Sequence, residues 1–204
     1  MAKTERIDLR AFQAELSERL KHKTTAEVGN LRLAIESASG HWLVRLADTG
    51  EVLPVPQMTP VPLTKPWFIG IANVRGALHG VIDFARFMGL QGARERSVAN
   101  AGQSRLVLLG ARFADIRAGL LVDRVLGLRN VADFQPVVES VNPVETVDPL
   151  DLLDPVAGVD GVNAVEIPRT WSRRRLTDAS GRAWRELDLA ALASDPQFLN
   201  VGAG

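Results

Sequence analysis

The chain has 204 residues, of which 46% are hydrophobic, and its 24 basic and 24 acidic residues cancel to a formal net charge of +0. This composition supports the substantial core of one domain or slightly more, and it excludes an intrinsically disordered chain. A neutral chain gives no electrostatic reason to expect nucleic acid or an anionic membrane as a partner, and the absence of cysteine excludes disulfides, thiol catalysis and cysteine-ligated metal sites.

The N-terminal stretch is charged and lacks the apolar core of a signal peptide. Its apolar residues fall on one face at helical spacing, which predicts a short helix over residues 8–22 with Asp8 as its N-cap. Two interpretations of this helix remain open: an extension packed onto the domain, or a helix that docks a partner. The residues that define its apolar face are Leu9, Phe12, Leu16 and Leu20.

From Asn30 onward the apolar period changes to two, which is typical of strands. Leu31, Leu33 and Ile35 alternate with residues expected on the solvent side, so residues 31–35 are predicted as a half-buried strand. Further strands are predicted at 42–46 and 52–55, separated by turn signals. Five prolines between residues 54 and 66 exclude a membrane-spanning helix there and favour a sheet edge or a surface segment.

The rest of the chain continues this pattern of short strands and turns, with few helices. Such a pattern is typical of a small barrel or a sandwich, and it fits both. Strands are predicted at 69–74, 77–82, 105–109, 118–122, 125–128 and 183–187, short helices at 83–90 and 189–193, an exposed loop at 91–104, and a long irregular connection at 139–155.

No recognised catalytic or metal-binding pattern is present in the sequence. The three histidines lie in three different predicted elements, and no pair of them has metal-ligand spacing. The chain also lacks a P-loop, a dinucleotide-binding glycine pattern and a nucleophile elbow. The sequence therefore predicts a protein that is not an enzyme and that uses neither a cofactor nor a metal.

The most informative segment is residues 66–84, which read PWFIGIANVRGALHGVIDF and place one Arg-Gly corner between two short apolar strands. This segment resembles the centre of the CheW-like coupling domain, and in its Pro-Trp-Phe, Ala-Asn and Asp-Phe pairs it is similar to the PilI-type subset. Gly80 stands where most such domains have proline, which suggests a more flexible edge at that strand. Phe84 replaces the usual leucine, and both departures match the PilI-type subset.

The resemblance implies a fold and a division of the chain. The fold is mainly β, with two small five-stranded barrels packed side by side, an N-terminal helix and short helices. The expected parts are a helical extension at 1–30, a CheW-like domain at 31–192 and a C-terminal tail at 193–204.

The Arg-Gly corner is the leading candidate for a binding site. Gly76 permits a backbone turn that a side chain would forbid, and Arg75 offers five donors in a planar fork suited to a carboxylate or to carbonyl groups of a partner. The alternative is an arginine paired with an acidic residue of its own chain. The resemblance favours partner binding, and it adds Glu51, Val52, Val122 and Asn73 to the corner as candidate contact residues.

Three further residues are expected to be structural. Trp67 is predicted in the core, Asp83 caps the helix that follows it, and Asp123 accepts backbone N–H bonds at a turn. Val122 and Asp123 belong to a run, Gly119 to Val125, that also resembles the family pattern.

The function implied by the resemblance is that of a non-catalytic adaptor. It would link the cytoplasmic tip of a methyl-accepting chemoreceptor to the regulatory domain of a CheA-like histidine kinase, in a chemosensory system that controls twitching motility by type IV pili. It would be cytoplasmic and recruited to membrane-associated receptor arrays, without binding nucleic acid or inserting into the membrane. The alternative is a β-domain scaffold for pilus or envelope proteins that has no kinase partner.

Overall fold

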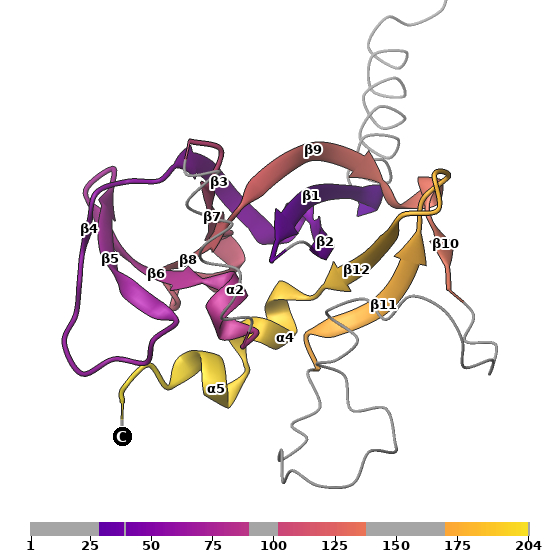
Figure 1. Cartoon of the computed structure of the whole chain (residues 1–204). Coiled ribbons are helices and arrows are strands. Elements are labelled where there is room, and N and C mark those ends of the chain that lie inside the picture. The colour runs from indigo at the N-terminus through magenta and orange to yellow at the C-terminus, as the bar shows by residue number, and fades with distance from the viewer. Residues whose placement is uncertain (1–28, 39, 90–101, 138–169, 204) are drawn as a thin grey trace, which may run out of the picture.

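The computed structural model describes residues 29–38, 40–89, 102–137 and 170–203 (Figure 1). The expected helix at 8–22 and the connection at 139–155 lie outside these residues, as does most of the loop at 91–104. The described part is mainly β, and its strands form two sheets that lie side by side in Figure 1.

The first sheet combines the beginning and the end of the described chain. Its strands run in the order β10-β11-β12-β2-β1-β9, and five of the six have five residues or more. They are β1 (Leu31–Ser37), β2 (Gly40–Arg45), β9 (Arg124–Asn130), β10 (Gln135–Pro136), β11 (Ser172–Thr177) and β12 (Ala183–Leu187).

The second sheet is built from the middle of the chain, in the order β3-β7-β8-β6-β5-β4. It again has five longer strands and one strand of two residues, so the predicted pair of five-stranded β units is confirmed. Its strands are β3 (Thr49–Pro54), β4 (Met58–Thr59), β5 (Phe68–Val74), β6 (Ala77–Asp83), β7 (Arg105–Leu109) and β8 (Ala118–Val122).

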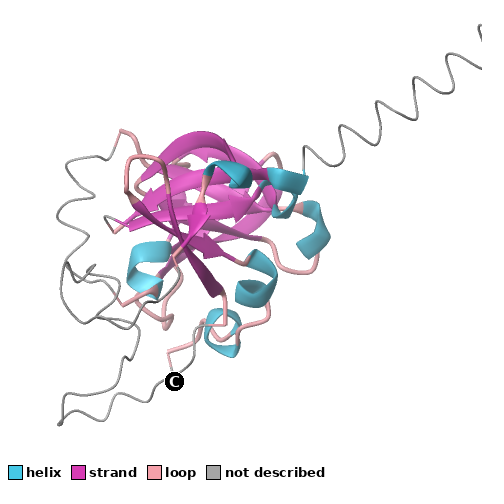
Figure 2. Ribbon diagram, turned by 90° about the vertical axis from the view of Figure 1, so that its right-hand side faces the viewer, coloured by secondary structure: helices cyan, strands magenta, loops and turns pink. Residues whose placement is uncertain are grey.

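Short helices complete the fold and lie at the margin of the strands (Figure 2). Three short α-helices of the described ranges each begin after an aspartate whose carboxylate accepts backbone N–H bonds, as expected of an N-cap. They are α2 (Phe84–Phe87), α4 (Leu189–Ala193) and α5 (Pro196–Leu199), and single 3-10 turns occur at η1 (Leu46–Asp48), η2 (Ala111–Phe113) and η3 (Val131–Asp133).

The main core is rich in aromatic rings and draws residues from both sheets and from the helices. Trp42 of β2 meets Phe84 of α2 edge to face, with ring centroids 5.3 Å apart, and it also lies against Trp171. The same cluster includes Ile35 of β1 in the first sheet and Leu120 of β8 in the second, so the two units share one core. Smaller apolar clusters lie on the far side of each sheet.

Strand β1 differs from the prediction, because it is buried on both faces. Leu33 and Ile35 join the main core as expected, but Ala34 is also fully buried and Arg32 is only 6% exposed. Arg32 is tolerated there because its Nε lies 3.2 Å from a carboxylate oxygen of the buried Glu186. An alternating pattern cannot reveal a second buried face when that face carries a small residue and a paired charge.

The prediction that Gly80 lies at a flexible strand edge is wrong. Strand β6 lies inside the sheet between β5 and β8, and the Gly80 N–H donates to the Arg117 carbonyl at 2.8 Å. A Cβ at this position would lie 2.8 Å from the Phe68 ring, so glycine allows the ring to close over the strand.

The packed chain continues past residue 192. Phe198 of α5 is 3% exposed and belongs to the main core, and the backbone at Thr64 pairs with Gly202. The division into 1–30, 31–192 and 193–204 stays a prediction, but the described residues of its last part are folded against the rest.

Candidate functional site

The Arg-Gly corner is a two-residue hairpin turn between β5 and β6. Val74 pairs with Ala77, and Arg75 and Gly76 between them both have positive φ, at 51° and 85°. Right-twisted hairpins favour this turn, but a side chain at positive φ is strained. Asn73 fixes the corner, because its Oδ1 accepts the Gly76 N–H at 2.8 Å. Asn73, predicted as a contact residue, therefore stabilises the turn through its side-chain oxygen in this structure.

The Arg75 guanidinium reaches across to the first residues of β3. Its Nη2 lies 2.7 Å from Oε1 of Glu51, and the two side chains are 79% and 41% exposed. Strand β3 is not hydrogen-bonded to β5 or β6, so the ion pair joins two parts of the second sheet that the backbone ladder leaves apart. The structure thus brings together two of the predicted contact residues, and it does so through the own-chain pairing that was the alternative for Arg75.

An exposed pair of this kind adds little to stability, typically about 0–1 kcal/mol. The strain of an arginine at positive φ acts in the other direction, at about 1–2 kcal/mol for a residue with a Cβ. Since the two contributions are of similar size, the corner is not explained by folding stability alone. The turn and the ion pair together hold the Arg75 guanidinium group at the surface in a fixed position.

Exposed apolar side chains occur close to the ion pair in the sequence. Val52 follows Glu51 directly and is 37% exposed. Leu78 lies opposite Asn73 in the β5–β6 hairpin and is 57% exposed. Leu78 was not singled out from the sequence, because in an alternating strand an exposed leucine looks the same as a buried one.

Val122 does not belong to this surface. It is 1% exposed, lies in the main core and pairs with Arg105 across β7 and β8. The structure therefore does not place this predicted contact residue at the surface, because the core shared by the two sheets covers its side chain.

The residues expected to be structural occupy structural positions. Trp67 is 6% exposed in the main core. Asp123 accepts the Ala38 N–H at 2.8 Å, and this bond ties the β8–β9 junction to the turn between β1 and β2, where Ala38 has a φ of 53°.

Asp83 caps α2 by accepting the Arg86 N–H at 3.1 Å, and its other carboxylate oxygen lies 3.3 Å from the Arg86 Nε. Burial raises the pKa of Asp83 above its ordinary value, and the Arg86 N–H and guanidinium oppose that rise. The cap predicted from the sequence is therefore present and partly buried.

Within residues 29–38, 40–89, 102–137 and 170–203, no three His, Asp or Glu side chains gather as a possible metal site. No helix in the same ranges is long and apolar enough to span a membrane.

Comparison with known proteins identifies a family and several partial relatives. A family model described as CheW-like domain matches residues 33–197. PilI of Pseudomonas aeruginosa is 35% identical over 85 residues, which cover 42% of this chain and 44% of PilI. FrzA of Myxococcus xanthus is 32% identical over 111 residues, or 53% of this chain and 59% of FrzA.

A chemotaxis protein CheW, that of Thermotoga maritima, is 29% identical over 85 residues, which cover 42% of this chain and 51% of the relative. The chain thus spans about half the length of the curated relatives it matches. Among solved structures, the scaffolding protein TtCheW from Thermoanaerobacter tengcongensis superposes with a TM-score of 0.53 at 18% identity, covering 78% of this chain and 89% of that one. This likeness concerns the fold, and it agrees with the two-sheet architecture described above.

Proposed function

The chain belongs to the family of CheW-like domains, and from this premise we propose that it is a non-catalytic adaptor of a chemosensory system that controls type IV pili. The likeness to PilI and FrzA supports the link to pilus-driven or surface motility. The adaptor would link the cytoplasmic tip of a methyl-accepting receptor to the regulatory domain of a CheA-like kinase. It would be cytoplasmic and held at membrane-associated receptor arrays through these partners.

The observation that carries the proposal is the exposed corner of Arg75, Gly76 and Glu51. Arg75 keeps a strained backbone conformation and a 2.7 Å ion pair, although about four-fifths of its side chain is exposed. Strained residues persist where the surrounding structure holds them, and they cluster at binding and switch sites. Together with the exposed apolar residues Val52 and Leu78, which lie near it in the sequence, the corner offers the polar and apolar groups that a helix of a partner needs for docking.

Coupling by such an adaptor requires no turnover. If the receptor tip and the kinase bind different faces of one rigid domain, a change in the receptor alters the kinase through linked binding equilibria. The two sheets share one aromatic core, which supports rigid transmission between faces.

The proposed corner can be tested with a charge exchange. Arg75→Glu should weaken binding of the receptor tip about tenfold or more, because it places two carboxylates side by side and removes the guanidinium fork. The double variant Arg75→Glu with Glu51→Arg restores an ion pair with exchanged ends. If Arg75 itself contacts the receptor, the double variant stays weak, whereas an ion pair that only braces the corner would give recovery.

Arg117→Glu is the matched control for charge and exposure. Arg117 is exposed, precedes β8 on the same sheet and has no ion pair among the described residues. Thermal melts of all variants separate loss of binding from loss of folding. Undiminished binding by well-folded Arg75→Glu would contradict the proposal, and it would favour a scaffold that engages other partners.

A further inference from the structure

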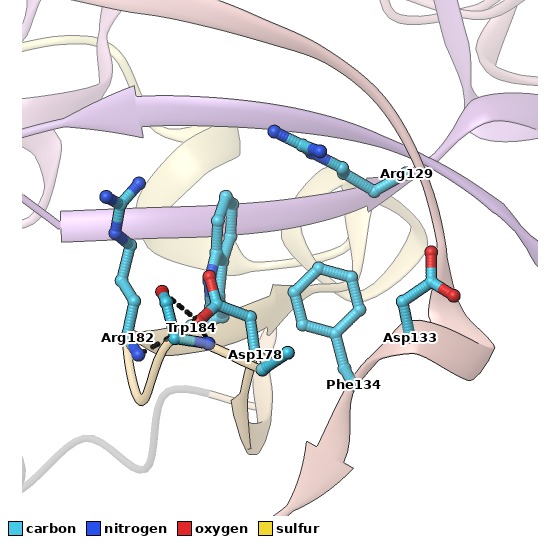
Figure 3. Close-up of a pocket in the computed structure, with 8 residues that line it drawn as sticks. Arg129, Asp133, Phe134, Asp178, Arg182 and Trp184 are labelled. Atoms are coloured by element: carbon cyan, nitrogen blue, oxygen red, sulfur yellow. Dashed lines mark hydrogen bonds between the residues drawn. The ribbon is translucent and has the colours of Figure 1, made fainter.

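A second surface feature lies on the first sheet, away from the Arg75 corner. It is a pocket of about 280 Å³ where η3 follows β9 and where the hairpin between β11 and β12 turns (Figure 3). Its floor is aromatic, since Phe134 and Trp184 are 8% and 3% exposed and meet edge to face with centroids 5.3 Å apart. A pocket of this size suits one or two side chains rather than a whole small-molecule ligand.

Two arginines border the pocket without an acidic partner. Arg129 of β9 and Arg182 of the hairpin are both exposed, and within the residues that the structure describes neither guanidinium has an ion pair or a side-chain hydrogen bond. In Figure 3 their guanidinium groups lie on either side of Trp184. Each offers a planar fork of donors, the geometry that binds a carboxylate with two parallel bonds.

The strand register explains why Arg129 lacks a partner. Arg45 pairs with Arg32, and Arg32 pairs with Arg129, so three arginines form a row across β2, β1 and β9. Like charges directly opposite one another repel, and each needs a counter-charge. Arg32 has Glu186, which Arg174 shares at 3.3 Å. Arg129 ends the row with its charge uncompensated among the described side chains.

The acidic residues at the pocket do not supply that counter-charge. The Asp178 carboxylate already accepts the Ser180 N–H and O–H at 2.9 and 2.6 Å, the Arg182 backbone N–H at 3.0 Å and the Trp184 indole N–H at 2.9 Å. These bonds hold the pKa of Asp178 well below its ordinary value, and they brace the hairpin. Asp133 also lines the pocket but forms no ion pair with Arg129 or Arg182, and it lies on the far side of Phe134 from Arg182 (Figure 3).

We propose that this pocket binds an acidic segment of a partner protein, with a carboxylate held between Arg129 and Arg182 and an adjacent apolar side chain against Phe134 and Trp184. The unpaired guanidinium groups supply the complementary charge, and the buried rings supply the apolar contact. The pocket is on the opposite sheet from Arg75. The inference is therefore independent of the function proposed for that corner.

The test uses the full chain and a short fluorescein-labelled peptide of Glu residues around one Phe. A matched peptide carries Gln at every Glu position. We expect the acidic peptide to bind in fluorescence polarisation at low salt, and the Gln peptide to bind at least about tenfold more weakly. Arg129→Gln and Arg182→Gln should each weaken the acidic peptide about tenfold, whereas Arg117→Gln should leave its affinity unchanged.

A second readout locates the binding. The Trp184 indole N–H resonance should shift on addition of the acidic peptide to the wild-type chain, because this group lies at the pocket floor and donates to Asp178. Equal affinity for both peptides would overturn the proposal. So would an equal loss in Arg117→Gln, or no binding at about millimolar peptide.

Discussion

Trp67 lies where three parts of the chain meet. Its ring packs edge to face on Phe87 of α2 at 5.2 Å and is stacked with Phe198 of α5 at 6.5 Å, and its carbonyl accepts the Asp83 N–H. Truncation would leave a large cavity in the shared core. Trp67→Ala should therefore lower the free energy of unfolding by about 3–5 kcal/mol in denaturant melts.

Leu78→Ala is the comparison for this prediction, because Leu78 is a large apolar side chain on a neighbouring strand but is 57% exposed. It should cost less than about 1 kcal/mol. A loss below about 1 kcal/mol in Trp67→Ala itself would contradict the packing described here.

Asp178 makes stability depend on pH in a predictable direction. Hydrogen bonds from Ser180 and Trp184 lower its pKa from the ordinary 3.8, so the folded state favours the carboxylate. Its contribution is complete above the unfolded pKa and is lost as the pH falls through the lower folded value. Asp178→Asn should therefore be less stable than the wild type near neutral pH, and the difference should narrow below about pH 4.

Urea melts of both proteins across this range measure the difference directly. The comparison is needed because Asp83 changes the stability with pH in the opposite direction. Its pKa is raised, so its contribution to stability is present at low pH and is lost as the pH rises through the folded value. A difference between wild type and Asp178→Asn that stays constant with pH would contradict the assignment to Asp178.

At the residue scale the sequence predicted the hydrogen bonds at turns and helix caps better than it predicted which side chains are buried. Asp83 and Asp123 were expected to hold a cap and a turn, and each carboxylate does accept a backbone N–H. Short-range hydrogen bonds follow from residue type and spacing. Val122 was misplaced because its burial depends on the packing of two sheets, which no local pattern contains.

At the element scale Gly70 sets how closely β4 approaches β5. It has a φ of 145° at a register shift in β5, and a Cβ there would lie 2.4 Å from the Thr59 carbonyl oxygen. Because the obstacle is backbone, it cannot move aside cheaply. Gly70→Ala should lower the free energy of unfolding by about 2–3 kcal/mol or more in chemical denaturation.

Gly102→Ala serves as the control, since no atom lies within 4 Å of a Cβ at that position. This change should leave stability within about 0.5 kcal/mol of the wild type. Equal effects of the two substitutions would show that β4 is not held against β5 as described.

Most elements were predicted where the apolar period is clear, as in β5 and β6 on either side of the Arg-Gly corner. Strand β11 is missing from the strands predicted from the sequence, because three consecutive arginines conceal its alternation. In the structure Arg173 pairs with Asp188, and Arg174 pairs with Glu186 of β12. Helix α5 has only four residues, which is too short for a helical period.

At the scale of the whole molecule the described strands begin in one sheet, build the other and return to the first. Strands β1 and β2 lie in the first sheet, β3 to β8 form the second, and β9 to β12 complete the first. With a shared core between them, the two units should unfold together. The prediction of two β units packed side by side rested on the family resemblance, because the strand pattern alone fits a sandwich equally well.

The measurement that tests the central claim most directly is a reconstitution. The full chain is mixed with the receptor tip and the kinase regulatory domain of the same bacterium, and sedimentation velocity determines whether one ternary complex forms. The account predicts a complex that contains all three proteins with wild type and Arg117→Glu, and its loss with Arg75→Glu. Failure of a well-folded wild-type chain to bind either partner would contradict the adaptor function, while the CheW-like fold would stand.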